Sequence, residues 1–550
     1  MNRKFVIGIA LFFGCIYAMG LFWGMPSEFV SEIDSEFPSG PFNIISHLKD
    51  NSYASPYPVF HRLLLLPMYA VVLLGLKITG QCSSFSATWP YGFRNPAAAL
   101  TMLITLARLV SLLMGAGTVC VLGFIVNRIA GKSNPKYRFL IFLPVLAFGL
   151  SGVVAYYSRT STYDIPQLFW WSLSLFFLWK YLLGPPLKKR NLIFSALFAA
   201  LTTATKDQMV FFVASSSLLL LVFPLSTESF PNRLKCFIIY SLYATVFYCV
   251  AAVIVQPYHW ISHMKEVLLL NITSGRFVMF PNTVSGQISL FMESLRCLSH
   301  IITPWGMAIS IISIPILIIK KKFNVLLTIV VPIFFTYIFV FARIHFVFER
   351  YMLNYAFLLS IAAALGIRCV IDTAISHKTL NYLLSALYLI MGCWLLHQLI
   401  FSFFPVTFAQ YQDTKKQLSR ILPAIVPAGD TIEWQGSRFS FPNAYAYTRY
   451  HFAVPDTVYS SLGSSRVHHA LVPSNASRAY VLSDRDLFCK DKNPIAVSRK
   501  NWIDTAGLKL IAEIHDPAFI QNHIQVYSAA HRVLTFRVSI PYYLYKRSPN

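Results

Sequence analysis

Long apolar runs alternate with short polar loops along most of the chain, and this pattern predicts membrane-spanning helices. A spanning helix needs roughly 20 predominantly apolar residues, and about eleven segments are expected to cross. They are about 5–24, 99–126, 139–157, 166–183, 191–205, 208–223 and 236–256, then a helix ending at 320, a helix emerging at 343, and about 351–371 and 380–404.

The short basic loops decide how these segments are oriented. Lys and Arg concentrate in cytoplasmic loops, and they fill the loops 127–138, 184–191 and 320–322. One apolar run, 63–76, is ambiguous, because a crossing there would move every later basic loop to the other side. The run is short and Pro67 interrupts it. We therefore interpret it as an interfacial helix, and the loops that carry few basic residues then face the outside.

The pattern changes near residue 411. The segment 411–422 reads as an amphipathic helix, and 478–484 and 523–538 alternate like strands. The sequence therefore predicts an α-helical polytopic membrane protein with a C-terminal soluble α/β domain. The expected division is a transmembrane catalytic domain over 1–404 and an outer, periplasmic or luminal, domain over 405–550.

Composition supports the membrane class and gives no indication of nucleic-acid binding. Hydrophobic residues make up 56% of the chain and charged residues 12%, with a mean hydropathy of +0.56. The formal net charge of +24 is explained by basic residues kept in cytoplasmic loops, and no RNA- or DNA-binding module accompanies it. The nine Cys form no C-x-x-C pair and no cluster with zinc spacing.

The first outer loop, 26–62, is polar and acidic in an otherwise apolar chain. Its first third contains Glu28, Glu32, Asp34 and Glu36. Such a cluster is either a solvated acidic loop or the source of a catalytic base. As the base we place Asp34 first, because it lies centrally and close after a membrane helix, then Glu36, then Glu32.

Further ionisable residues are expected on the same outer face. Ionisable residues at membrane depth are costly and tend to be functional. Each has a local alternative: Asp164 could cap the helix after it, Asp207 could pair with Lys206, and Arg350 could anchor the chain at the interface. The polar residues expected there are Arg159, Asp164, Lys206, Asp207, His259, Arg276, His345, Glu349, Arg350 and Tyr351.

The chemistry that suits this face is glycosyl transfer from a lipid-phosphate sugar. The phosphate is the leaving group, and cations that neutralise it lower the barrier. The residues expected to bind it are Lys206, Arg159, His345, Arg350 and Tyr351. The acceptor hydroxyl needs a base on the opposite side of the anomeric carbon, and one in-line displacement inverts the configuration. We expect no obligatory metal, although clustered carboxylates make a divalent metal possible.

Six segments along the chain form a recognisable series. They are EIDSEF (32–37), YPVFHRLLLLP (57–67), 106–131, YYSRTSTYDIP (156–166), LTTATKDQMVFF (201–212) and 345–367. In this order they resemble the GT-C superfamily of polyprenyl-phosphate-sugar glycosyltransferases, in its protein-mannosyltransferase and aminoarabinose-transferase branches. The similarity covers about residues 1–372. Two departures are Tyr57-Pro58-Val59, where the family pairs two prolines, and Asp-Ser-Glu, where it has Asp-Glu.

The resemblance implies an inverting glycosyltransferase that works on the periplasmic or luminal side of the membrane. By it, Asp34 matches the catalytic base, and Asp164 matches a second acidic position near the acceptor or sugar. Lys206 and Arg350 match phosphate-contacting positions. The implied partners are a polyprenyl-phosphate sugar and a lipid, glycan or protein acceptor, and the short loops favour a bacterial inner membrane.

Three alternatives compete with this function. A transporter or flippase of lipid-linked sugars would be expected to show internal repeats and polar, broken helices at mid-membrane depth. The sequence shows no repeat, and its ionisable residues cluster at helix ends, which favours the enzyme. A ligase that uses a lipid-diphosphate donor, and a membrane anchor whose working part is the C-terminal domain, stay open. The sugar and the acceptor are not readable from the sequence.

Overall fold

The computed structural model describes most of the membrane part and some of the C-terminal part. The candidate bases Glu32, Asp34 and Glu36 lie outside the described residues, and so do His259 and Arg276. The described residues are 3–25, 58–85, 91–130, 137–182, 189–222, 229–254, 260–261, 280–345, 347–376, 381–412, 414–434, 449–454, 471–473, 480–483, 508–514 and 542–547.

The chain divides into two compact units. The first, here the helical unit, comprises Met1–Ala18, Gly40–Leu64 and Leu109–Phe404. The second, here the sheet unit, comprises Met19–Ser39, Leu65–Arg108 and Pro405–Asn550. The predicted division at residue 404 thus coincides with one boundary between units, but the sheet unit also takes two earlier segments. That 405–550 forms a separate soluble domain stays a prediction.

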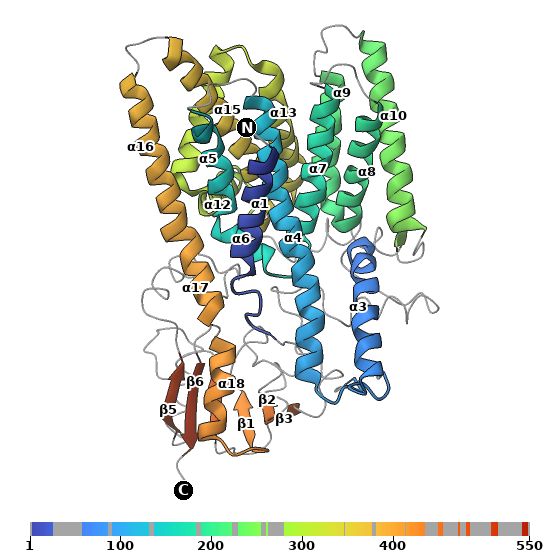
Figure 1. Ribbon diagram of the computed structural model, residues 1–550, viewed down its shortest axis with the longest axis vertical. Helices are drawn as coiled ribbons and strands as arrows, with labels where there is room; N and C mark the ends of the chain where they lie inside the picture. Colours follow the sequence, from blue (N-terminus) through green and yellow to red (C-terminus); the bar gives the residue numbers. More distant parts are fainter. Residues whose placement is uncertain are drawn as a thin grey trace. The chain divides into compact units, whose positions relative to one another are not determined.

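The helical unit consists of helices that run back and forth between two ends (Figure 1). π-helical turns η3 (Cys249–Val253), η4 (Tyr337–Phe341) and η7 (Leu399–Phe403) extend three of them. The helices are α1 (Arg3–Ala18), α4 (Pro96–Ala130, from Leu109 onward in this unit), α5 (Arg138–Gly149), α6 (Gly152–Ser158), α7 (Asp164–Leu182), α8 (Lys189–Thr205), α9 (Val210–Val222), α10 (Phe230–Tyr248), α12 (Val284–Ile319), α13 (Phe323–Thr336), α14 (Ala342–Ile344), α15 (Leu353–Ser376) and α16 (Asn381–Gln398), with 3₁₀ turns η2 (Asp207–Met209) and η5 (Glu349–Met352).

These helices confirm a polytopic membrane protein. Seven described helices are long and apolar enough to cross a membrane, and α5 with α6, which meet at 56°, would make an eighth. α1 and α9 are apolar but shorter. Each span predicted from the sequence coincides with one described helix or with a pair of them.

Helix α3 (Phe60–Ile78) is among the seven by length and composition, but the packing of α1 and α4 argues against a crossing. Gly14 of α1 faces Ala116, whereas Val6 faces Gly123, so α1 and this part of α4 are antiparallel. Two antiparallel neighbours require an even number of crossings between them, and α3 alone would supply an odd number. The packing therefore favours the interfacial interpretation.

Helix α12 is bent in its middle, and a neighbouring helix satisfies the backbone there. Thr303, directly before Pro304, has φ 59° and ψ 162°; a residue before proline is disfavoured in the helical region. The kink frees two carbonyl oxygens, which accept hydrogen bonds from α16. Trp394 Nε1 donates to Ile302 O at 3.0 Å, and Gln398 Nε2 donates to Ile301 O at 2.8 Å.

Close helix contacts depend on small residues. A Cβ added to Gly366 of α15 would lie 2.0 Å from Ser313 Oγ of α12. In the same way, a Cβ on Gly149 would lie 2.3 Å from the ring of Phe13. Small residues let membrane helices approach closely, so these glycines bring α15 to α12 and α5 to α1.

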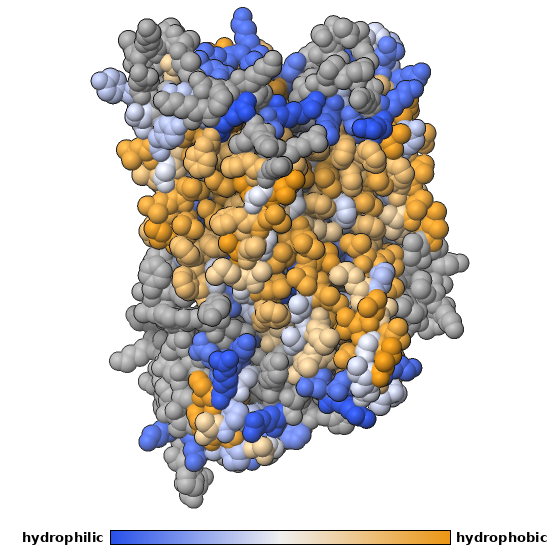
Figure 2. Space-filling view, viewed as in Figure 1, coloured by the Kyte–Doolittle hydropathy of each residue, from blue (hydrophilic) through white to orange (hydrophobic). Residues whose placement is uncertain are grey.

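The helical unit has a basic end. α7 and α8 are antiparallel, so Lys189 and Arg190 lie opposite the turn that follows α8. α12 ends there too, at the exposed Lys320, Lys321 and Lys322. Figure 2 shows hydrophilic side chains gathered at the upper end of this unit, where Figure 1 marks the N-terminus, and hydrophobic side chains over the helices below.

The sheet unit contains a six-stranded mixed sheet in the order β3-β2-β1-β4-β6-β5. β1, β2, β3 and β4 pair in parallel, and β6 pairs antiparallel with β4 and β5. The predicted amphipathic helix is confirmed as α18 (Thr414–Ile425), and the predicted strand at 478–484 as β4. α17 (Phe404–Gln412) precedes α18, and the strands are β1 (Thr431–Trp434), β2 (His451–Val454), β3 (Leu471–Pro473), β4 (Tyr480–Ser483), β5 (Leu508–Ile514) and β6 (Tyr542–Arg547).

Candidate functional site

Asp164 opens helix α7, directly after a buried polar turn. The turn predicted at 158–164 is confirmed, with α6 ending at Ser158 and α7 beginning at Asp164. Pro166 lies in the first turn of α7, where proline is tolerated because its missing N–H has no helical partner. Thr160 and Thr162 are buried, and their Oγ1 atoms lie 3.2 Å apart. The local sequence therefore fixes a carboxylate at the end of the helical unit opposite the basic end.

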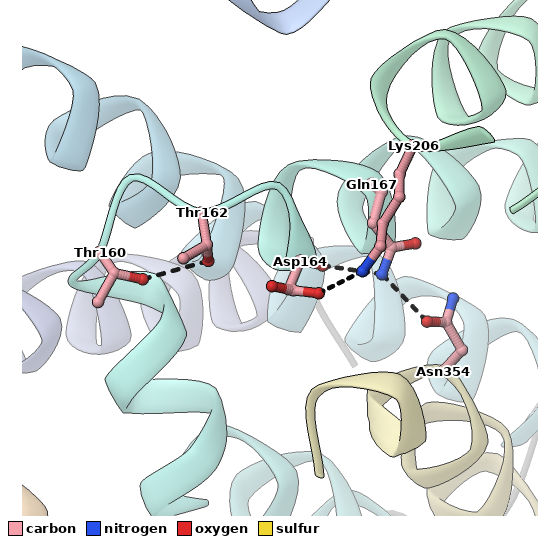
Figure 3. A network of polar contacts seen from close by, with 6 residues as sticks. All are labelled: Thr160, Thr162, Asp164, Gln167, Lys206 and Asn354. Atoms are coloured by element: carbon pink, nitrogen blue, oxygen red, sulfur yellow. Dashed lines mark hydrogen bonds and ion pairs between the residues drawn. The ribbon is translucent and has the colours of Figure 1, made fainter. Parts of the chain in front are cut away.

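Lys206 pairs with this carboxylate. It is an extended residue between α8 and η2, and its Nζ lies 2.7 Å from Asp164 Oδ1 (Figure 3). Both side chains are only 4% exposed. A charge-assisted hydrogen bond of this length between buried groups keeps both charged. Asp164 is thus the ion-pair partner of Lys206, 42 residues away in the sequence. A role as the cap of helix α7 alone does not account for this ion pair.

The ring of Tyr351 contacts two cations. The ring of Tyr351 is 4.6 Å from Lys206 Nζ and 5.4 Å from the guanidinium carbon of Arg350. Both Arg350 and Tyr351 come from η5 and are half-buried. Cations over an aromatic face are attracted by its negative potential. The ring therefore holds two positive charges close together that would otherwise repel.

A pocket opens beside these cations. It contains about 400 Å³ of space, counting the part open to the outside, and Lys206, Arg350 and Tyr351 line it. Phe212 and Phe341 form part of its apolar wall. A pocket with cations at one place and aromatic or aliphatic side chains at another suits an amphiphile that has an anionic group and a hydrocarbon chain.

Two amide side chains that the sequence analysis did not single out also line this pocket. They are Gln167 of α7 and Asn354 of α15, which are 2% and 1% exposed. Gln167 Nε2 donates to Asp164 O at 2.9 Å and to Asn354 Oδ1 at 3.1 Å. A signal existed: each is a polar residue in an apolar helix, one turn after Asp164 or Arg350 respectively.

Arg159 lies elsewhere, at the end of helix α1. Its Nε donates to Tyr17 O at 3.0 Å, and its Nη2 donates to Ile16 O at 2.8 Å. The guanidinium also lies 5.5 Å from the ring of Phe403. Carbonyls in the last turn of a helix lack helical partners and attract cations. Arg159 therefore serves the C-terminus of α1, and its predicted place in the phosphate site is not supported.

His345 is near η5 in sequence but is held by another helix. It adopts a left-handed conformation with φ 53°, and its Nδ1 lies 3.2 Å from Gln287 Nε2 of α12. Its backbone oxygen accepts a hydrogen bond from Phe280 N at 3.2 Å. His345 is not among the described residues that line the pocket, so its predicted phosphate contact has no support here.

Glu349, next to Arg350, is held from α12. It is 2% exposed, and its Oε1 lies 3.4 Å from His300 Nδ1. This contact ties the start of η5 to α12, just before the kink at Thr303. The segment η5, which contains Arg350 and Tyr351, is therefore held against α12.

Of the predicted site residues, the structure brings together Asp164, Lys206, Arg350 and Tyr351. Lys206 and Arg350 are the charged residues among the described residues that line the pocket, and they suit an anion with several acceptor oxygens. Lys supplies a point charge, whereas Arg supplies a planar fork of donors. The predicted bases Asp34 and Glu36 lie outside the described residues.

Comparison with known proteins gives a weak structural likeness. Neither a protein-family model nor a curated protein sequence matches the chain. Two crystal structures of ArnT from Cupriavidus metallidurans are similar. The apo structure is 12% identical with a TM-score of 0.47, over 92% of this chain and 96% of that chain. The structure bound to undecaprenyl phosphate is 12% identical with a TM-score of 0.43, over 93% and 97%. At these identities and TM-scores, the likeness is too weak to support a conclusion about this chain.

Proposed function

We propose that the protein is a glycosyltransferase that moves a sugar from a polyprenyl-phosphate donor to an acceptor hydroxyl, with inversion at the anomeric carbon. The observation that carries the proposal is the pair of cations, Lys206 and Arg350, on a partly apolar pocket. The phosphate would lie against the cations and the first prenyl units against the apolar wall. Undecaprenyl phosphate, which one of the ArnT structures contains, is the lipid-phosphate part of such a donor without its sugar.

The two cations act on the leaving group. As the bond from the anomeric carbon to the phosphate oxygen breaks, negative charge grows on the phosphate, and preorganised cations stabilise it. Lys206 is held ready by Asp164, and Arg350 by the anchored η5. No metal is needed for this charge stabilisation, and we propose that none is obligatory.

Asp164 supports Lys206 rather than accepting the acceptor's proton. One of its oxygens is already engaged at 2.7 Å with an ammonium, which lowers its basicity. The base must approach the anomeric carbon from the side opposite the phosphate, and we propose Asp34 of the first outer loop, with Glu36 as the second choice.

We place the reaction on the outer face, the periplasmic face of a bacterial inner membrane. Basic residues favour the cytoplasmic side, and the pocket residues lie at the other end of the helical unit. A donor headgroup would meet Lys206 and Arg350 at the depth where the helices end.

The test is turnover of a panel of undecaprenyl-phosphate sugars by the purified protein, read as release of undecaprenyl phosphate. Arg350→Gln is expected to lower kcat/KM about a hundredfold, because one donor to the developing charge is lost. Arg343→Gln is the matched control: Arg343 is exposed, lies seven residues earlier, and is expected to leave the rate unchanged.

Two results would contradict the proposal. An equal loss of kcat/KM in Arg350→Gln and Arg343→Gln would mean that turnover depends on the overall positive charge and not on the cations of this pocket. Absence of release from every donor, together with movement of a lipid-linked sugar across proteoliposome membranes, would replace the enzyme by a transporter.

A further inference from the structure

The hydrogen bonds in the pocket fix which way the amide of Gln167 points. Its nitrogen must face the backbone oxygen of Asp164, 2.9 Å away, because a carbonyl oxygen only accepts. The same nitrogen donates to Asn354 at 3.1 Å, so the atom that Asn354 presents there is its oxygen. The backbone oxygen of Asp164 thus fixes the orientation of the Gln167 amide, and the Gln167 amide fixes that of Asn354.

This orientation leaves one acceptor and one donor for something else. Gln167 Oε1 and Asn354 Nδ2 are buried and have no hydrogen-bond partner among the described residues. Figure 3 shows both atoms on the same side of the Gln167–Asn354 hydrogen bond, turned away from Asp164. Both residues line the pocket that contains Lys206 and Arg350. Buried polar groups are normally satisfied, so the pair calls for a partner.

We propose that Gln167 and Asn354 form a binding site for a hydroxyl of the transferred sugar. This inference rests on the proposed function and names the part of the donor that these two residues recognise. A hydroxyl donates one hydrogen bond and accepts another, which matches Gln167 Oε1 and Asn354 Nδ2 at once. The two residues therefore contribute to sugar specificity.

Other parts of the donor fit the two atoms less well. A phosphate oxygen only accepts and would leave Gln167 Oε1 unsatisfied, and a protonated amine only donates and would leave Asn354 Nδ2 unsatisfied. Prenyl carbons offer neither function. A sugar linked to a phosphate held by Lys206 and Arg350 brings hydroxyls within a few bonds of that phosphate.

The experiment compares two lipids in equilibrium binding to the full-length protein: undecaprenyl phosphate, and the undecaprenyl-phosphate sugar that the wild type turns over fastest. Asn354→Asp keeps an oxygen to accept from Gln167 and removes the donor. Its new charge would weaken both lipids alike, so undecaprenyl phosphate is the internal reference. Asn324→Asp, at the basic end, is the matched control, and Asn354→Ala is a second, neutral variant.

The expected result is that both Asn354 variants weaken the sugar-bearing lipid about tenfold more than undecaprenyl phosphate, because a buried hydroxyl contact is lost. Among lipids that carry a monodeoxy form of that sugar, one is expected to bind the wild type about tenfold more weakly than the lipid with the complete sugar. The Asn354 variants are expected to bind this monodeoxy lipid and the lipid with the complete sugar equally well. This identifies the hydroxyl.

Equal weakening of the two lipids would overturn the inference, since the residues would then be structural or would act on the phosphate. The inference would also be overturned if the wild type and the Asn354 variants showed the same order of affinities for the monodeoxy lipids. Only water would then bind to Gln167 Oε1 and Asn354 Nδ2. If the wild type binds undecaprenyl phosphate but shows either result, the inference alone fails. If it binds none of the phosphate lipids, the proposed function fails and the inference fails with it.

Discussion

The two ends of the helical unit use positive charge in opposite ways. At the basic end, Lys320, Lys321 and Lys322 follow α12 and are exposed. At the other end, Lys206 is buried, paired with Asp164 at 2.7 Å and placed over the ring of Tyr351. One end presents several cations to the surroundings, and the other holds few cations in fixed geometry.

The difference concerns desolvation. An exposed lysine keeps its water and needs no specific partner, so its effect is collective and screened by salt. A buried lysine loses its water, and it stays charged only because other groups replace that water. Exposed cations can orient a chain in a membrane, whereas buried cations can recognise one ligand.

The largest effect on turnover is expected for the proposed base, and a carboxylate at the basic end serves as its control. Asp34→Asn should lower kcat about a thousandfold, because a base for the acceptor hydroxyl is lost, while donor binding persists. Asp372→Asn, at the basic end, removes an exposed carboxylate that faces Arg368 at 3.4 Å and should leave turnover unchanged. Undecaprenyl phosphate release measures both. Equal rates for Asp34→Asn and the wild type would make Glu36 the next candidate.

A smaller effect, on stability, is expected at the buried ion pair. Lys206→Met leaves the Asp164 charge buried without its ammonium, and breaking such a pair costs about 3–5 kcal/mol. The double variant Lys206→Met with Asp164→Asn removes that charge and should recover most of the loss. Thermal unfolding in detergent measures the difference. A double variant as unstable as the single one would mean that Lys206 contributes by packing alone.

The matched lysine at the other end sharpens this prediction. Lys180, in the last turn of α7, lies over the rings of Phe176 and Phe177 at 4.6 and 5.3 Å. Lys180→Met keeps the contact between the aliphatic part of the side chain and these rings, so the unfolding temperature should change little.

The smallest effect on turnover is expected at the exposed lysines. Replacing Lys320, Lys321 and Lys322 together by Gln should change kcat/KM by less than about twofold, since exposed charges act weakly and non-specifically. The same variant should bind vesicles rich in anionic lipid less well than the wild type, in a salt-dependent way. A loss of turnover comparable to that of Arg350→Gln would erase the distinction between the ends.

Much of the fold could be predicted because it depends on local properties of the sequence. Length and apolarity predicted the spans, and the polar turn before Pro166 placed Asp164 correctly. Basic loops predicted which helix ends lie together. Each of these signals lies within one segment.

The site was only partly predictable, because its contacts join segments far apart in the chain. Lys206 meets Asp164 across 42 residues, and the sequence equally allowed a pair with Asp207. Arg159 was predicted to bind the phosphate because the sequence does not reveal that the C-terminus of α1 lies beside this arginine. Gln167 and Asn354 were overlooked, although single amides in apolar helices are a signal of function.

The central claim is that the buried Lys206 and the half-buried Arg350 recognise a lipid phosphate. The most direct measurement is the affinity of the protein for undecaprenyl phosphate compared with undecaprenol, which has the same chain and no phosphate. We expect the wild type and Arg343→Gln to prefer the phosphate strongly, and Arg350→Gln to lose about a hundredfold of that preference. Equal binding of the two lipids to the wild type, or an undiminished preference in Arg350→Gln, would contradict the claim.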